Sequence, residues 1–475
     1  MIVKKAFLYS GPVCALILAL PFVEVSLAAR RTTQPQHTIV AASGGAAPAG
    51  GNYLPLFSNA RMNARDEVAF DAVVGSPLFT SGVFAGNGST TSTIALGANP
   101  DPAAPSFGDV RNPFITPNGD VVFQANSSDL LTSEGRTIVP LARDGDQAPG
   151  GGTLALTGTF AVNDHGAVVF EAGISGATAT DGLFRTDGRQ TVAIVRDDSN
   201  VPTGGRFAGL FSGPVINDLG QVAFFAEMTG GAADFGIFRG EGGNLTPVFV
   251  ANQIAPGGAT FDDFSDPVIN RHGQVAAFAS LSNGPSSGGL FVSDGTDAVA
   301  IALQGQPAPK GGSYRAQNTF LGPIRLNDRG EVAFTARLTG TTSSSGIFRG
   351  DGNRTTAIAL AATSAPGTTG TFQSFDDIRL AIDGRVAFVA TLTVGVGGVN
   401  SSNNRGIWIG ASDDDLQLVV RTGEVIGGKV LTRLPSFGVD NRFDMNQNGV
   451  LWIGDFGFAK AIVLSRFLDE NDDPR

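Results

Sequence analysis

The stretch "INDLGQVAFF", Ile216–Phe225, is nearly repeated further along the chain as "LNDRGEVAFT", Leu326–Thr335. In both copies an Asn opens a four-residue run that ends in Gly, and an apolar segment follows. An Asn side chain can accept the backbone N–H two residues on, and Gly readily takes the left-handed conformation that closes a tight turn. The phrase therefore predicts a hairpin turn whose Gly leads directly into a strand.

Versions of this phrase occur eight times, 47 to 65 residues apart, in a chain of 475 residues. Repeats of about this period are typical of solenoids and propellers. The 65 Gly and 25 Pro residues suit many short strands and turns rather than long helices. Counted from the Asn position, the eight phrases begin at Asn63, Thr116, Asn163, Asn217, Asn270, Asn327, Ala381 and Asn446.

Each repeat unit also contains a second hairpin signal. Gly346–Phe348 ("GIF"), for example, is followed by the turn pair Asp351-Gly352 and the apolar run Ala357–Leu360. An Asp-Gly pair between apolar runs is a strong hairpin signal. Each unit is thus expected to supply four antiparallel strands, with both tight turns at one end and the longer connections at the other. Because such units cannot bury their apolar faces alone, radial stacking into an all-β propeller is expected.

The two ends of the chain predict how the ring closes. Thr38–Gly51 reads as a fourth strand with its Pro/Gly link, whereas Ser436–Ser465 reads as the first three strands only. The N-terminal strand is therefore expected to complete the last blade, which removes two free sheet edges. The count is eight blades, with seven as the alternative if the unit at Thr116, which lacks "GIF", forms no blade of its own.

The N-terminus predicts export. A basic start, Met1–Lys5, precedes the apolar segment Ala6–Val23 and a few small residues, as in a secretory signal peptide. The only cysteine, Cys14, lies in this segment, so the cleaved protein must be stable without disulfides. Gly11 and Pro12 weaken the alternative of an uncleaved membrane helix, and no second apolar span of about 20 residues follows.

We therefore divide the sequence into a signal peptide, a linker, a propeller and a polar tail, and expect a periplasmic, cell-surface or extracellular protein. No membrane span is expected after signal cleavage, and the protein is expected to be a monomer. The formal net charge of −11 argues against a nucleic-acid partner bound through a basic surface. The four segments are 1–29, 30–36, 37–466 and 467–475.

The "NxxGxxAF" phrase resembles a family of bacterial exported tandem-repeat proteins that is named for this motif and has varied cell-surface anchors. Asn217–Phe224 and Asn327–Phe334 match the motif outright, and Asn163–Phe170 matches it nearly. The resemblance covers essentially the whole mature chain and implies an exported repeat protein without an established activity. This chain departs from the pattern because its tail shows no C-terminal sorting signal, which favours a soluble exported form.

No catalytic or cofactor-binding residues are predicted, because neither the HExxH motif nor the Walker motif occurs. His165 and His272 occupy one turn position that holds Leu219 or Arg329 in other units, and are interpreted as exposed turn residues; His37 also receives no role. Acidic groups are interpreted as solvated loop charges, and the arginines after "GIF" as structural. These are Asp262-Asp263, Asp376-Asp377 and Asp413–Asp415, with Arg185, Arg239 and Arg349.

One segment carries a calcium alternative. Asp444, Asn446, Asn448, Gly449 and Asp455 have the spacing of an EF-type calcium loop, with Asp where Glu is usual. The competing interpretation is that this segment is the eighth hairpin turn, whose Asn and Gly need no metal. A strand after Gly449 would also differ from the helix of an EF-hand.

The leading functional prediction is a non-catalytic binding or scaffolding propeller at the cell envelope or outside the cell, with an unidentified polysaccharide or protein as ligand. The longest variable loop, Leu392–Arg405, is the first expected contact surface. One alternative is a glycan-active hydrolase or lyase, which requires two or more carboxylates within about 10 Å of each other around the axis. The other alternative is a structural cell-surface component.

Overall fold

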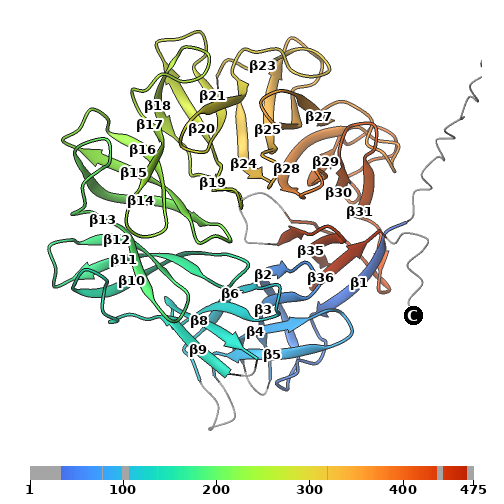
Figure 1. Ribbon diagram of the computed structural model, residues 1–475. Coiled ribbons are helices and arrows are strands. Elements are labelled where there is room, and N and C mark those ends of the chain that lie inside the picture. Colours follow the sequence, from blue (N-terminus) through green and yellow to red (C-terminus); the bar gives the residue numbers. More distant parts are fainter. Residues whose placement is uncertain are drawn as a thin grey trace, which may run out of the picture.

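The computed structural model describes residues 34–76, 79–98, 106–135, 137–317, 319–435 and 442–467. Every regular element within these residues is a β-strand, and the strands form eight blades arranged in a ring (Figure 1). The protein is therefore an eight-bladed β-propeller, which confirms the predicted fold class. The seven-blade alternative is wrong, because the unit at Thr116 forms a sheet of its own although it lacks "GIF".

The first four blades are regular antiparallel sheets in chain order. Blade 1 comprises β2 (Tyr53–Met62), β3 (Val68–Val74), β4 (Thr80–Gly86) and β5 (Thr91–Leu96). Blade 2 comprises β6 (Val110–Ile115), β7 (Val121–Ala125), β8 (Asp129–Glu134) and β9 (Thr137–Ala142). Blade 3 comprises β10 (Thr153–Val162), β11 (Val168–Ser175), β12 (Asp181–Thr186) and β13 (Thr191–Arg196). Blade 4 comprises β14 (Arg206–Ile216), β15 (Val222–Thr229), β16 (Phe235–Gly240) and β17 (Thr246–Val250).

In blades 5 and 6 the first strand is split in two. Blade 5 comprises β18 (Thr260–Phe264) with β19 (Val268–Ile269), β20 (Val275–Ser282), β21 (Gly288–Ser293) and β22 (Ala298–Leu303). Blade 6 comprises β23 (Ser313–Tyr314) with β24 (Phe320–Leu326), β25 (Val332–Thr339), β26 (Ser345–Gly350) and β27 (Thr355–Leu360). Blade 7 comprises β28 (Phe372–Leu380), β29 (Val386–Leu392), β30 (Arg405–Gly410) and β31 (Gln417–Arg421), and a small hairpin follows it, β32 (Val425–Ile426) and β33 (Lys429–Val430).

Blade 8 is built from both ends of the chain. It contains β34 (Phe443–Met445), β35 (Gly449–Phe456), β36 (Ala459–Arg466) and, as its fourth strand, β1 (Gln36–Ala42). In Figure 1 the blue β1 lies beside the red strands of blade 8, antiparallel to β36 from Gln36↔Arg466 to Ala42↔Ala461. Ring closure by the N-terminal strand is thus confirmed. The predicted signal peptide, 1–29, and the tail beyond residue 467 lie outside the described residues.

Aromatic pairs fill the middle of most blades. In blade 4 Phe224 of the "AF" phrase lies directly across from Phe238 of "GIF", with ring centroids 6.1 Å apart. Phe207 of the first strand packs edge-on against Phe238 at 5.2 Å, a favourable aromatic geometry. The Gly of "GIF" is required by this packing, because a Cβ on Gly236 would come within 2.9 Å of the Phe238 ring. The equivalent cross-strand pairs are Phe70–Phe84, Phe170–Phe184, Phe334–Phe348 and Phe388–Trp408.

The Asn that opens each turn phrase has two functions. In blade 4 the Oδ1 of Asn217 accepts the backbone N–H groups of Leu219 (3.1 Å) and Gln221 (2.9 Å), which fixes the turn. Its Nδ2 donates to the backbone carbonyl of Asn270 in the next blade, at 3.0 Å. A side-chain amide can accept and donate at once, whereas an ionised Asp can only accept. Asn therefore shapes its own turn and fastens its blade to the neighbour.

The same cross-blade bond recurs around the ring, and we call this set the Asn ladder. Thr116 and Ala381 cannot donate an amide at the equivalent positions, and the buried Oγ1 of Thr116 has no hydrogen-bond partner among the described residues. The ladder bonds are Asn63→Thr116, Asn163→Asn217, Asn217→Asn270, Asn270→Asn327, Asn327→Ala381 and Asn446→Asn63.

The arginines that follow "GIF" add a second set of links between blades. Arg185 donates its Nη1 to the carbonyl of Gly220, the turn glycine of the next blade, at 2.8 Å. Arg239 and Arg349 make the equivalent bonds to the turn glycines that follow them, Gly273 and Gly384. The structural interpretation of these arginines is confirmed.

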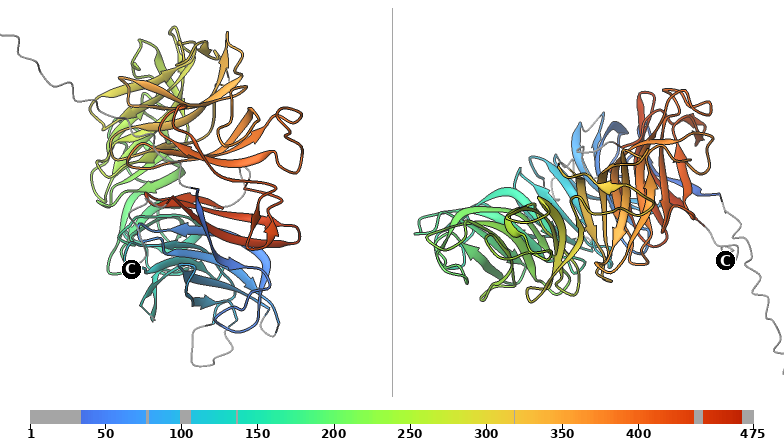
Figure 2. Two further views of the ribbon diagram at one scale, coloured as in Figure 1. Left: turned by 90° about the vertical axis from the view of Figure 1, so that its right-hand side faces the viewer. Right: turned by 90° about the horizontal axis from the view of Figure 1, so that it is seen from above.

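The ring is a flat body with two different ends (Figure 2). The Asn turns and the turns between third and fourth strands lie at one end, which we call the turn end, and the connections between second and third strands lie at the other, the loop end. In the part of the chain that the structure describes, no helix has the length and apolarity needed to cross a membrane.

Candidate functional site: the central channel

The first strand of each blade lies nearest the ring axis (Figure 1). On this strand, the residue two positions before the turn Asn differs in charge from blade to blade. This residue is charged in blades 6, 7, 8 and 1, and apolar in blades 2 to 5. The eight positions are equivalent in the repeat and have the same place in their blades. The difference between charged and apolar residues therefore does not follow from the fold. Around the ring from blade 1 they are Arg61, Phe114, Ala161, Val215, Val268, Arg325, Arg379 and Asp444.

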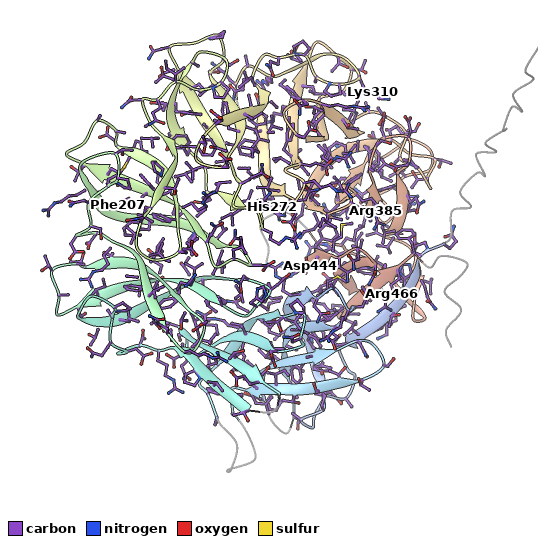
Figure 3. The ribbon with its side chains drawn as sticks, in the orientation of Figure 1. Phe207, His272, Lys310, Arg385, Asp444 and Arg466 are labelled. Carbon is purple, nitrogen blue, oxygen red and sulfur yellow. The ribbon has the colours of Figure 1, made fainter. Side chains whose placement is uncertain are left out.

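Six of these eight residues line one cavity of about 960 Å³ on the axis. Figure 3 shows Asp444 near the centre of the ring, whereas Phe207 and Lys310 lie further out. Charged residues form one wall of the cavity, and Phe114 and Phe160 from blades 2 and 3 contribute to an apolar wall. The size is within the usual range of pockets for small ligands, roughly 300–1,000 Å³.

Two arginines of the charged wall are held by one carboxylate. Asp377 Oδ1 lies 2.7 Å from Arg379 Nη1 and 3.4 Å from Arg325 Nη2, and it also accepts the N–H of Ile378 at 2.9 Å. A break in the β28–β29 register between Phe375 and Ile378 marks a bulge, which re-aims the side chains beside it. The cluster is therefore fixed by backbone geometry as well as by charge.

Asp444 connects the charged wall to blade 1. Its Oδ1 lies 3.9 Å from Arg379 Nε, and its Oδ2 accepts the backbone N–H of Met62 at 3.1 Å. Arg379 also lies over the Phe443 ring, 5.3 Å from its centroid. Asp377 and Asp444 thus share one guanidinium, which places the two carboxylates within about 10 Å of each other, the separation that glycosidic chemistry requires.

Arg61 differs from the other two arginines of the wall because its guanidinium group has no hydrogen-bonded partner among the described residues. It is half-buried in the cavity wall, and within the described residues its side chain makes neither a hydrogen bond nor an ion pair within 4.0 Å. Three guanidinium groups, those of Arg61, Arg325 and Arg379, lie on this wall beside the Asp377 and Asp444 carboxylates, and Asp164 adds a third carboxylate at the turn end of the cavity. The Asp444 carboxylate acts on this charge of Arg61 only from beyond 4.0 Å, and an anion bound directly to Arg61 would reduce the cost of burying it.

Burial alters the acid–base properties of the cavity. It lowers the pKa of Arg61, an effect that the Asp444 carboxylate opposes. Burial, and then the positive charge of Arg379, lower the pKa of Arg325 to about 9. Arg325 therefore remains cationic at neutral pH. At the turn end of the cavity, desolvation by the surrounding turns and the nearby Asp218 carboxylate raise the pKa of Asp164.

The residues of the calcium alternative do not gather in one place. Asn446 Oδ1 accepts the backbone N–H groups of Asn448 (2.8 Å) and Gly449 (2.9 Å), so it serves a turn as the other phrase asparagines do, although its second bond is one residue shorter. Asp455 lies four residues beyond Leu451, the cross-strand partner of Asp444, which separates the two carboxylates by about 13 Å at the usual rise per residue. A strand, β35, follows Gly449.

The histidines lie outside the cavity wall. His165 and His272 are exposed in their turns, as predicted. His37 is half-buried on β1, where its Nδ1 lies 2.8 Å from Ser465 Oγ and its ring contacts Trp452 edge-on at 6.3 Å. His37 therefore belongs to the closure of the ring rather than to the candidate site.

The interpretation of the acidic pairs needs correction. Asp376 and Asp377 are not solvated loop charges: both are half-buried on β28, and Asp376 lies 2.7 Å from Arg405 Nη2. Strand bulges bury such pairs where sequence alone suggests a loop. Asp262 and Asp263 are exposed but lie on β18. Within the third group, Asp413 pairs with Lys310 at 3.2 Å.

The loop Leu392–Arg405, the first expected contact surface, lies at the loop end between β29 and β30. Val394 and Val396 are exposed there, whereas Val399 is buried and anchors the loop. The axial cavity opens instead among the Asn turns. Sequence reasoning missed Arg61, Arg325 and Arg379, although a charge two residues before the turn Asn, where other repeats have Val or Ala, was a readable signal.

Fold and site together define an eight-bladed β-propeller with a charged axial cavity. The chain belongs to the family described as "Family of unknown function (DUF7453)", whose model matches residues 23–294 and 127–453. No curated protein matches the sequence.

Among solved structures, the chain is similar to several proteins at low identity, and no argument about function rests on them. One is the β-propeller domain of the Trilobed protease from Pyrococcus furiosus (11% identity, 77% of this chain and 98% of that chain, TM-score 0.38). Another is a puromycin-hydrolyzing peptidase of Mycobacterium tuberculosis (14%, 94% and 58%, TM-score 0.42). A third is Sqt1 of Saccharomyces cerevisiae (12%, 86% and 97%, TM-score 0.40).

Proposed function

We propose that this propeller is a non-catalytic binding or scaffolding protein, exported to the cell envelope or the extracellular space, that holds its ligand in the axial cavity. The observation that carries the proposal is the Arg61 guanidinium, which faces a cavity of about 960 Å³ with all its donors free of described partners. Cavities with a few convergent polar groups and an apolar wall are the usual form of ligand sites.

The two carboxylates of the charged wall, Asp377 and Asp444, support binding better than catalysis. Asp377 is occupied by Arg379, Arg325 and the N–H of Ile378, and Asp444 by Arg379 and the N–H of Met62. These contacts hold four blades together around the axis, blades 6, 7, 8 and 1. A general acid or base needs an oxygen that can reach the substrate, and these oxygens are already committed to the protein.

The export part of the proposal is supported by the signal-like sequence of residues 1–29. Membership in the exported NxxGxxAF repeat proteins is supported by the Asn ladder, since the Asn and Gly of that motif are the residues that form the turn and the cross-blade bond. Finding the protein in the cytoplasm with Met1–Ala29 still attached would contradict export.

A thermal-shift screen of the purified protein against polysaccharides, calcium and EDTA tests the binding function. We expect at least one polysaccharide to raise the melting temperature, and the shift to disappear in a channel variant such as Phe114→Ala. A shift that every channel variant preserves would contradict the location of the site. A shift with calcium alone would indicate a cation site elsewhere than the axial cavity. Concentration-dependent self-assembly would instead support a structural cell-surface role.

A glycan-active hydrolase or lyase is the second candidate. It is favoured by the closeness of Asp377 and Asp444 and by the raised pKa of Asp164, a carboxyl group that is therefore more readily a proton donor. Product analysis after incubation with the polysaccharide that shifts the melting temperature distinguishes the two functions. New reducing ends or unsaturated sugars, lost in Asp164→Asn, would establish the enzyme.

A further inference from the structure

We propose that the axial cavity recognises a carboxylate-bearing sugar, with the carboxylate on Arg61 and the pyranose ring on the apolar wall of blades 2 and 3. This inference rests on the proposed binding function and names its ligand class. It starts from the contrast among eight equivalent positions, where blades 6, 7, 8 and 1 present charges and blades 2 to 5 present apolar groups. A ligand that matches both halves must be charged on one side and apolar on another.

The charged half selects an anion. Arg325 and Arg379 already bind Asp377, and Arg379 also lies near Asp444, whereas Arg61 has no such partner among the described residues. Arg61 therefore supplies the site's open donors. A guanidinium presents paired N–H groups that match a carboxylate bidentately, and such charge-assisted bonds are about twice as strong as neutral ones.

The fixed ion pairs also determine which sign of charge the ligand can carry next to Arg61. Asp444 is anchored by the N–H of Met62, the residue that follows Arg61 on β2. A cationic ligand group beside Arg61 would also meet Arg325 and Arg379 on the same wall and would be repelled by these guanidinium groups. The charged wall therefore disfavours cations next to Arg61, whereas Asp164 lines the cavity at its turn end.

The apolar half argues against a bare inorganic anion. Phe114 and Phe160 line the wall with Pro113 and Pro117, so a sulfate or phosphate ion would leave this surface in contact with water only. A pyranose ring has an apolar C–H face and carries its carboxylate at the ring edge in a uronic acid. Such a residue, alone or at the end of a chain, fills a cavity of about 960 Å³ better than a single ion does.

Isothermal titration of the purified protein with trigalacturonate tests the ligand class. Four control ligands separate the charge from the sugar ring. The methyl ester of trigalacturonate and maltotriose have sugar rings without the charge. Triglutamate has carboxylates without a sugar ring, and sulfate is a bare inorganic anion. We expect trigalacturonate to bind at least tenfold more tightly than each of these. Equal binding of the ester, of triglutamate or of sulfate would overturn the inference, the last showing an unspecific anion site only.

Variants locate the contact. Arg61→Gln keeps hydrogen-bonding capacity without charge and is expected to weaken binding of trigalacturonate at least tenfold, and Arg61→Lys, which keeps the charge without the planar fork, by a smaller factor. Arg354→Gln, at an exposed outer turn, is the matched control and should bind as the unaltered protein does. Unchanged binding by Arg61→Gln would overturn the assignment of the carboxylate to Arg61.

The failure of this inference is distinguishable from failure of the binding function. If a neutral glycan binds, and Phe114→Ala weakens it while Arg61→Gln does not, the cavity is the binding site but not for an anion. If Phe114→Ala and Arg61→Gln both leave every ligand's affinity unchanged, the cavity is not the site, and both proposals fail.

Discussion

Asn446 donates its side-chain amide to the backbone carbonyl of Asn63 at 2.8 Å, although 383 positions separate the two residues in the chain. This bond is the rung of the Asn ladder that joins the last blade to the first. A second bond from the same amide reaches the Asp66 side chain at 2.6 Å, and Asp66 pairs with Arg466 of β36 at 2.7 Å. The turn phrase at the end of the chain is therefore completed by the turn phrase at its beginning.

Removal of the closing strand should destabilise the whole ring. Deleting Gln36–Ala47 exposes the edge of β36 and the apolar groups beneath β1, including the buried Val40 and Ala41. We expect a fall in melting temperature of more than about 10 °C, since several kcal/mol of packing and hydrogen bonding are lost. Differential scanning calorimetry measures this, and an unchanged melting temperature would refute the closure.

Breaking one rung of the Asn ladder should cost more than breaking an ordinary surface contact. Asn217→Ala leaves the N–H groups of Leu219 and Gln221 and the carbonyl of Asn270 without their side-chain partner. We expect a loss of about 2–4 kcal/mol in the free energy of unfolding, because a buried polar group that loses its hydrogen-bond partner is not compensated for its desolvation. Asn353→Ala, at an exposed turn, is the control and should change stability by less than about 0.5 kcal/mol.

Filling a gap in the ladder should stabilise the protein. Thr116 occupies an Asn position and its buried Oγ1 has no partner among the described residues. Thr116→Asn offers an amide to the carbonyl of Asn163, as Asn63 does to Thr116 at 2.9 Å. Chemical denaturation should show a gain of about 1 kcal/mol. A loss of stability would mean that the interface between blades 2 and 3 differs from the others in more than this one side chain.

His37 should make ring closure sensitive to mild acid. Burial against Trp452 and Ser465 lowers its pKa below the usual 6.5, so the unfolded chain takes up the proton first. Its contribution to stability is therefore complete above the unfolded pKa of about 6.5 and is lost as the pH falls through the folded value. Denaturant melts between pH 5 and pH 8 should show this loss, and His37→Gln should reduce it. Identical pH profiles for the two proteins would argue against the effect.

Binding of trigalacturonate should weaken in alkaline solution. Burial and Arg379 lower the pKa of Arg325 to about 9, so the cavity loses a positive charge as the pH rises through that value, while the ligand's carboxylates stay ionised. Titrations from pH 7 to pH 10 should show falling affinity above about pH 9, and Arg325→Gln should flatten the profile. Constant affinity up to pH 10 would mean that the positive charge of Arg325 does not contribute to binding of trigalacturonate.

The sequence predicted the architecture because its determinants are local and repeated. Asn217 and Gly220 define a turn by their own chemistry, and the step between phrases defines a blade. The site was not predicted, although Arg61, Arg325 and Arg379 share one repeat position, because only the closed ring shows that this position faces a cavity. Asp377 was misread for a related reason: its position beside the β28 bulge, not its residue type, directs it to the two arginines.

The most direct test of the central claim is a crystal structure of the protein soaked with trigalacturonate. It should show a carboxylate at about 2.7–3.0 Å from the Arg61 guanidinium, with the pyranose ring facing Phe114. Sugar bound at the loop Leu392–Arg405, with only water in the axial cavity, would contradict both the location and the chemistry of the site.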